Sequence, residues 1–156
     1  MKVAITKDQY GKLVGFGQAG AKTYEKFLQA VRALEPGEML SFEYRVPRSQ
    51  RFHGLHFAML TAVFDNQEQW QDEYQFRKWT EAGAGHADIA PGPKGKPIAV
   101  VRSIAYDALD DEEFHVLHEA IKAFLRSEHA VRFLWPEVNV SLAMASMDQL
   151  IAEFER

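Results

Sequence analysis

The sequence predicts an α+β fold, in which a small antiparallel sheet of about four strands packs with about four to five helices. Short alternating runs of apolar residues and longer helical repeats of apolar residues support this class. The chain of 156 residues is 47% hydrophobic and 12% aromatic, which is enough apolar material for a core. We therefore expect a single domain over residues 1–156.

The first elements are a hairpin and a helix. Val3 and Ile5 alternate with other residues, as do Val14 and Phe16, and Tyr10-Gly11-Lys12 lies between the two runs. Helical spacing of apolar residues follows over residues 21–34 and ends at Glu35-Pro36-Gly37. The hairpin and this helix form the predicted segment 1–38.

A third strand is expected over residues 39–46, because apolar side chains alternate there until Pro47. The second predicted segment covers residues 39–135, and a C-terminal helical segment covers 136–156. Further helices are predicted at residues 49–66, 72–82, 110–127 and 139–154, and further strands at 98–106 and 130–135.

The predicted helix over residues 49–66 carries apolar stripes on two sides. Phe52, Leu55 and Met59 belong to one stripe, and Phe57 and Leu60 to the other. A helix of this kind is central in its domain or lies in a subunit interface. It supports the expectation of a homodimer.

Residues 83–97 contain four glycines and three prolines, with Lys94 and Lys96 near the end. This composition predicts a long irregular loop, because proline and glycine disfavour helices and central strands. We expect the loop to be mobile in the free protein and to become ordered when a ligand binds.

Composition excludes several classes of protein. The absence of cysteine removes disulfides and thiolate metal sites, as expected in a reducing cytoplasm. No signal-peptide pattern and no apolar stretch of membrane-spanning length occurs, so we expect a soluble cytoplasmic protein without membrane contact. The net charge of -4 argues against binding nucleic acid by bulk positive charge, and leaves open a local basic patch.

The segment 45–56 has three arginines, two histidines and no acid, and it spans the start of the central helix. The N-terminus of a helix has unpaired N–H groups and partial positive charge. Arginines at this position are unfavourable without an anion and attractive with a phosphate. The alternative is that these arginines pair with surface acids.

The pairs His53/His56 and His115/His118 have a spacing that can hold a metal on one helix face, but no third ligand is identifiable. A core or interface role is the alternative for His118. Acidic residues at 107 and 110–113 could bind magnesium, yet their place before a helix also suits capping. We predict no metal, no cofactor and no catalytic residue.

Four short motifs follow one another along the middle of the chain. They are Arg48-Ser49-Gln50-Arg51-Phe52-His53, Phe76-Arg77-Lys78-Trp79, Val100-Val101-Arg102-Ser103-Ile104-Ala105, and Glu113-Phe114 with Ile121-Lys122-Ala123-Phe124. These motifs resemble the lambda-type NinB, or Orf, recombination proteins of bacteriophages and a related phage family of uncharacterised early proteins. The similarity covers about residues 40–135 and makes 39–135 the family-like segment.

The resemblance implies a small, dimeric, non-catalytic accessory protein of phage DNA recombination in the bacterial host cytoplasm. Such a protein binds single-stranded or branched DNA and the host single-strand-binding protein. Phosphates would supply the affinity, and aromatic rings would stack on bases. The predicted phosphate contacts are Arg45, Arg48, Arg51, Arg77, Lys78, Lys94, Lys96 and Arg102, and the predicted stacking residues are Phe52, Trp70 and Trp79.

Two other functions compete with this interpretation. A phage protein that binds and modulates a host protein would use exposed apolar and aromatic anchors and needs no catalytic signature. A metal-dependent nuclease would use His115, His118 and the acidic cluster.

Overall fold

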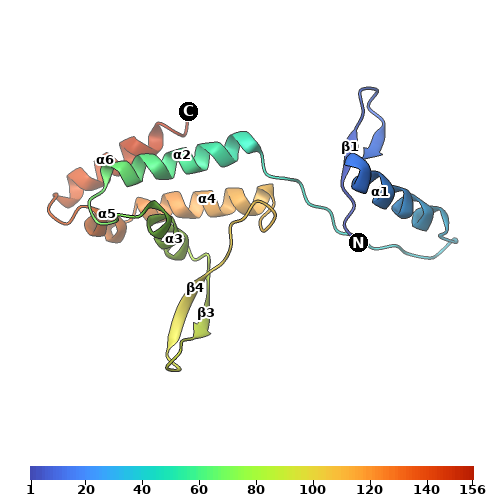
Figure 1. Ribbon diagram of the computed structural model, residues 1–156. Coiled ribbons are helices and arrows are strands. Elements are labelled where there is room, and N and C mark those ends of the chain that lie inside the picture. Colours follow the sequence, from blue (N-terminus) through green and yellow to red (C-terminus); the bar gives the residue numbers. More distant parts are fainter. The chain divides into compact units, whose positions relative to one another are not determined.

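The computed structural model describes residues 1–156 and divides the chain into two compact units, Met1–Tyr44 and Arg45–Arg156 (Figure 1). The chain thus has two units in place of the single domain expected from its length. All residues of the buried hydrophobic core belong to the second unit, and Gly20 is the only buried residue of the first. No helix is both long and apolar enough to span a bilayer.

The first unit confirms the predicted hairpin and helix. Strand β1 (Ile5–Lys7) pairs antiparallel with β2 (Leu13–Gly15), and helix α1 (Gly17–Arg32) follows. The Asp8 carboxylate closes the turn, because it accepts hydrogen bonds from the backbone N–H groups of Tyr10 and Lys12 at 2.8 and 2.9 Å.

The strand predicted over residues 39–46 does not form. The alternation of apolar residues is present, but no neighbouring strand supplies the backbone hydrogen bonds that a ladder requires. Phe42 contacts Phe27 of α1 edge to face, with ring centroids 5.5 Å apart, and Met39 and Tyr44 are exposed.

The helices of the second unit begin where capping residues stand. Ser49, Asp72 and Asp110 accept hydrogen bonds from backbone N–H groups of the first helical turns, which would otherwise be unpaired. The helices are α2 (Gln50–Asn66), α3 (Glu73–Gly83), α4 (Asp111–Leu125), α5 (Glu128–Leu134) and α6 (Val140–Ala152).

Helix α2 is central, as its two apolar sides predicted. Met59, Leu60 and Val63 are fully buried, while Phe64 packs on Phe76 of α3 with ring centroids 5.7 Å apart. Figure 1 shows α2 and α4 running side by side. Since the chain itself covers the second stripe, α2 gives no argument for a second subunit, and the homodimer stays a prediction.

The segment 83–97 is not an irregular loop. Strand β3 (Ala87–Pro91) pairs antiparallel with β4 (Pro97–Val101), and the resulting hairpin projects from the helices (Figure 1). Pro91 and Pro97 pair at the end of the ladder beside the turn, where proline is tolerated. Gly95 has φ +79°, a backbone conformation that glycine adopts without strain.

The α+β class is confirmed, but the strands form two separate two-stranded sheets and not one larger sheet. The strand predicted at residues 130–135 is helix α5, which Ser127 caps by accepting from the N–H of Ala130 at 3.2 Å. Its buried residues Ala130, Val131 and Leu134 have the spacing of a helix.

Candidate functional site

A surface pocket of about 280 Å³ in the second unit is lined by α2, α3 and residues 104–106. It combines aromatic rings with cationic and anionic side chains. A larger hollow of about 440 Å³ between the end of α2 and α6 contains no cationic side chain. The smaller pocket is therefore the better candidate for binding an anionic or polar ligand.

Helix α3 contributes four side chains at helical spacing to the pocket: Tyr74, Arg77, Lys78 and Glu81. The Lys78 ammonium lies 2.8 Å from a carboxylate oxygen of Glu81 and 5.4 Å from the centroid of the Tyr74 ring. Glu81 is only 1% exposed, so Lys78 compensates a carboxylate that is almost fully removed from water.

Arg77 lies against the aromatic wall that α2 supplies. Its guanidinium carbon is 5.1 Å from the centroid of the Phe57 ring, a cation–π distance. The Nε atom of Arg77 is buried and has no hydrogen-bond partner. Buried donors are normally paired, so this N–H is a donor that the protein itself leaves unsatisfied.

Arg48 was predicted to contact phosphate, but its side chain is buried and does not face solvent. Its side chain is 2% exposed and donates hydrogen bonds to the carbonyl oxygens of Leu109 (3.1 Å), Ile104 (2.8 Å) and Ala105. Its guanidinium carbon also lies 4.3 Å from the centroid of the Phe114 ring. The charge at the start of α2 therefore holds the 104–106 wall of the pocket in place.

Tyr106 and His53 complete the wall next to Arg48. The Tyr106 hydroxyl donates to the carbonyl oxygen of Arg48 at 2.6 Å, and the His53 ring lies 5.7 Å from the Tyr106 ring. Burial, followed by the nearby Arg48 charge, lowers the pKa of His53. His53 is consequently neutral at pH 7 and adds no positive charge to the pocket.

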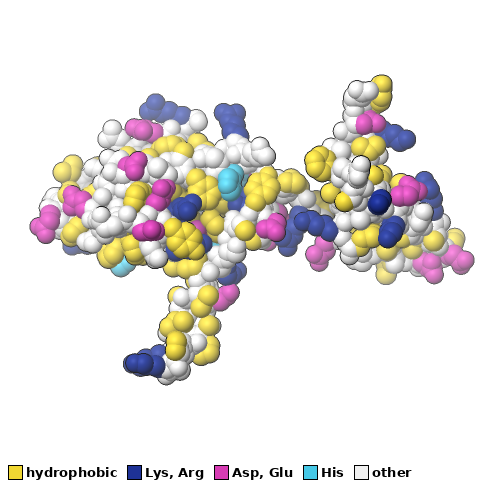
Figure 2. Space-filling view, in the orientation of Figure 1, with side chains coloured by type: hydrophobic (Ala, Val, Ile, Leu, Met, Phe, Trp, Pro, Cys, Tyr) yellow, Lys and Arg dark blue, Asp and Glu magenta, His cyan; other side chains and the backbone are white.

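The other predicted basic residues lie at the surface. Arg45 and Arg51 are exposed, and Arg102 is exposed with its Nε 3.8 Å from a carboxylate oxygen of Asp88. Lys94 and Lys96 lie in the turn between β3 and β4, form no ion pair, and occupy the tip of the hairpin. Figure 2 shows positive side chains at this tip.

The predicted stacking residues are occupied within the protein. Phe52 stacks on His115 with centroids 3.7 Å apart and an interplanar angle of 2°. Trp70 and Trp79 are half-buried and pack against the hydrophobic core. The rings that line the pocket are instead Phe57, Tyr74 and Tyr106, and the helical spacing of Tyr74, Arg77 and Glu81 was a signal in the sequence.

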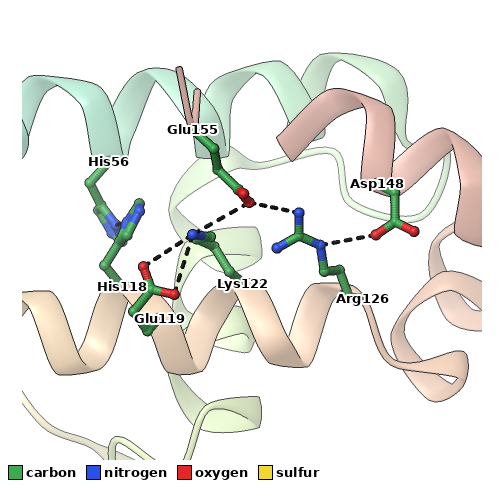
Figure 3. A network of polar contacts seen from close by, with 7 residues as sticks. All are labelled: His56, His118, Glu119, Lys122, Arg126, Asp148 and Glu155. Atoms are coloured by element: carbon green, nitrogen blue, oxygen red, sulfur yellow. Dashed lines mark hydrogen bonds and ion pairs between the residues drawn. The ribbon is translucent and has the colours of Figure 1, made fainter. Parts of the chain in front are cut away.

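The histidines considered as metal ligands pair between helices and not along one helix. The Nδ1 atoms of His56 and His118 are 2.8 Å apart in the core, and no cluster of three or more histidine or acidic side chains is arranged for a metal (Figure 3). Beside them Lys122 binds Glu119 and Glu155, and Arg126 binds Glu155 and Asp148. These ion pairs join α4 to α6 and to the residues after it.

The acidic cluster before α4 acts in capping. Asp110 and Glu113 form a capping box, and a carboxylate oxygen of Asp111 accepts from the backbone N–H of Ser49 at 3.0 Å. These contacts tie the starts of α2 and α4 together. They match the capping alternative and do not favour a nuclease site.

No family model, no curated protein and no solved structure matches this chain.

Proposed function

We propose that the protein is a non-catalytic module that binds single-stranded DNA through its second unit. The observation that carries the proposal is the hairpin β3–β4, whose tip presents Lys94 and Lys96 to solvent without acidic partners. Arg102 follows β4 directly, and the pocket with Arg77 and Lys78 lies beyond it. The motifs similar to NinB-type proteins support a role as an accessory protein of phage DNA recombination, acting with the host single-strand-binding protein.

The net charge of -4 weighs against binding by bulk charge, so the proposal depends on a local cluster of positive side chains. Phosphate contacts release condensed counterions, so a few lysines and arginines on one surface supply affinity without an overall positive charge. Arg48 is not part of this surface, because its donors are used by backbone carbonyls. The predicted contacts that remain exposed in the second unit are Arg45, Arg51, Lys94, Lys96 and Arg102.

A binding assay with a charge-matched control tests the proposal. The variant Lys94→Ala/Lys96→Ala removes the charges at the tip of β3–β4. The control Lys7→Ala/Lys12→Ala removes the same number of exposed charges from the hairpin of the first unit. Fluorescence anisotropy with a labelled single strand should show weaker binding for the first variant alone. Equal binding of both variants and the unmodified protein would exclude the hairpin as the contact surface.

A further inference from the structure

We infer that the pocket between α2, α3 and residues 104–106 takes one unstacked nucleobase of a bound single strand. The inference rests on the proposed function, because it assigns a base-binding part to the same surface. Phosphate contacts at the tip of the hairpin and a base in the pocket would give the strand a fixed path over the second unit.

The size of the pocket fits one base. Its volume of about 280 Å³ is just below the range of about 300–1,000 Å³ that holds drug-sized ligands. A base within a duplex is stacked and paired, and it would have to lose both interactions before it could enter. A base of a single strand is free to turn into such a pocket.

The walls supply surfaces for stacking. Tyr74 and Tyr106 line the pocket and are 56% and 46% exposed, so their rings lie near its opening. Phe57 lies deeper, between His53 at 4.7 Å and the Arg77 guanidinium at 5.1 Å. Aromatic rings bind bases of any sequence, since every base presents a π face.

The polar side chains match the edge of a base. Every base carries hydrogen-bond acceptors, and the unpaired Nε–H of Arg77 is a donor without a partner. Exocyclic amino groups of bases are donors, and the carboxylate of Glu81 is an acceptor within the same pocket. A bare phosphate would gain from Arg77 and Lys78 but would meet the Glu81 charge.

The geometry also links the pocket to the hairpin. Residues 104–106 follow strand β4 after two intervening residues, Arg102 and Ser103, and β4 begins next to the lysines of the turn. Arg48 fixes residues 104 and 105 by hydrogen bonds to their carbonyl oxygens. A DNA strand that runs along β4 from the tip of the hairpin therefore reaches the 104–106 wall of the pocket, which Arg48 already holds in position.

The test uses the full chain and two probes, deoxyadenosine monophosphate and the base-free deoxyribose 5-phosphate. Nuclear magnetic resonance should show shifts of the Arg77 Nε–H and of the Tyr74 and Phe57 ring signals with the nucleotide. The sugar phosphate should leave these signals in place. Equal shifts with both probes would reduce the pocket to a phosphate site, and the absence of shifts with both would also overturn the inference.

A second measurement uses a single strand carrying one fluorescent 2-aminopurine. Tyr74→Ala should weaken binding about tenfold, since it removes one stacking surface. Tyr74→Phe keeps the ring and should bind as the unmodified protein does, as should the control Tyr44→Ala in the first unit. Unchanged binding of Tyr74→Ala would contradict the base pocket while the lysine variants still test the proposed function. If no single strand binds at all, the proposed function fails. The nucleotide titration then tests by itself whether the pocket binds a base.

Discussion

His56 and His118 face each other across the core with their Nδ1 atoms 2.8 Å apart. One ring must donate and the other accept. The Nε2 atom of His56 is buried and has no partner, so a proton there would be an orphaned donor. We infer that His56 carries its proton on Nδ1 and donates it to His118, because an unpaired lone pair is tolerated better than an unpaired buried N–H.

The first prediction is that acid destabilises the protein through this pair. Burial, followed by the nearby His118, lowers the pKa of His56 to about 3, and burial, followed by Lys122, lowers that of His118 to about 4. The unfolded chain therefore binds protons below pH 6.5 that the native state does not. The histidine pair therefore makes its full contribution to the free energy of unfolding above this pH. That contribution is lost as the pH falls toward 4, with a slope of about 1.4 kcal/mol per pH unit for each such proton.

Urea unfolding between pH 7 and pH 4.5 measures this slope. The double variant His56→Gln/His118→Gln should show a shallower dependence, and the exposed control His129→Gln should keep the full one. Among the other charged groups, Glu119 and Glu155 oppose the lowering of the His118 pKa, and Arg48 and Arg77 add to the lowering of the His56 pKa. A slope that persists in the double variant would assign the acid sensitivity to another group.

The second prediction separates Arg48 from Arg51. Arg48→Ala removes a buried side chain with its hydrogen bonds to the carbonyl oxygens of Leu109 and Ile104, and it should lower the free energy of unfolding by about 2–4 kcal/mol. Arg51 is exposed, and Arg51→Ala should change stability by less than about 0.5 kcal/mol. Thermal unfolding of both variants distinguishes them. Equal melting temperatures would mean that the Arg48 contacts contribute nothing.

The third prediction concerns the independence of the units. The buried hydrophobic core begins at Met59, so a chain of residues 45–156 should unfold with the same melting temperature as residues 1–156. A marked loss of stability would show that the first unit supports that core.

Light scattering on both chains tests the predicted homodimer. If residues of the first unit such as Met39 and Phe42, which are exposed, mediate it, the shorter chain should be a monomer.

The fourth prediction is a change in salt dependence. Each phosphate contact with single-stranded DNA adds about 0.7 to the slope of log affinity against log salt concentration. Lys94→Ala/Lys96→Ala should reduce that slope by about 1.4 if both ammonium groups contact phosphates. The slope of Lys7→Ala/Lys12→Ala should equal that of the unmodified protein. An unchanged slope for the hairpin variant would mean that its lysines act through stability and not through phosphates.

The sequence by itself determined the first hairpin and every helix except α5, which it predicted as a strand. Their signals are local: apolar residues recur within a few positions, and Ser49, Asp72 and Asp110 cap the helices beside them. The same local rules wrongly predicted an irregular loop at residues 83–97, where glycine and proline mark the turn and the ends of a hairpin. They also wrongly predicted a strand at residues 39–46, because alternation of apolar residues without a pairing strand gives no sheet.

The tertiary structure alone decided which side chains form the candidate site. Arg48 meets Leu109, and His56 meets His118, across 61 and 62 positions of the chain. No periodicity reports such separations, so the charge of Arg48 looked available to a ligand although the fold places it inside. Phe57 and Arg77 come together in the same way, because burial and pairing depend on how helices pack and not on the residues that flank each position.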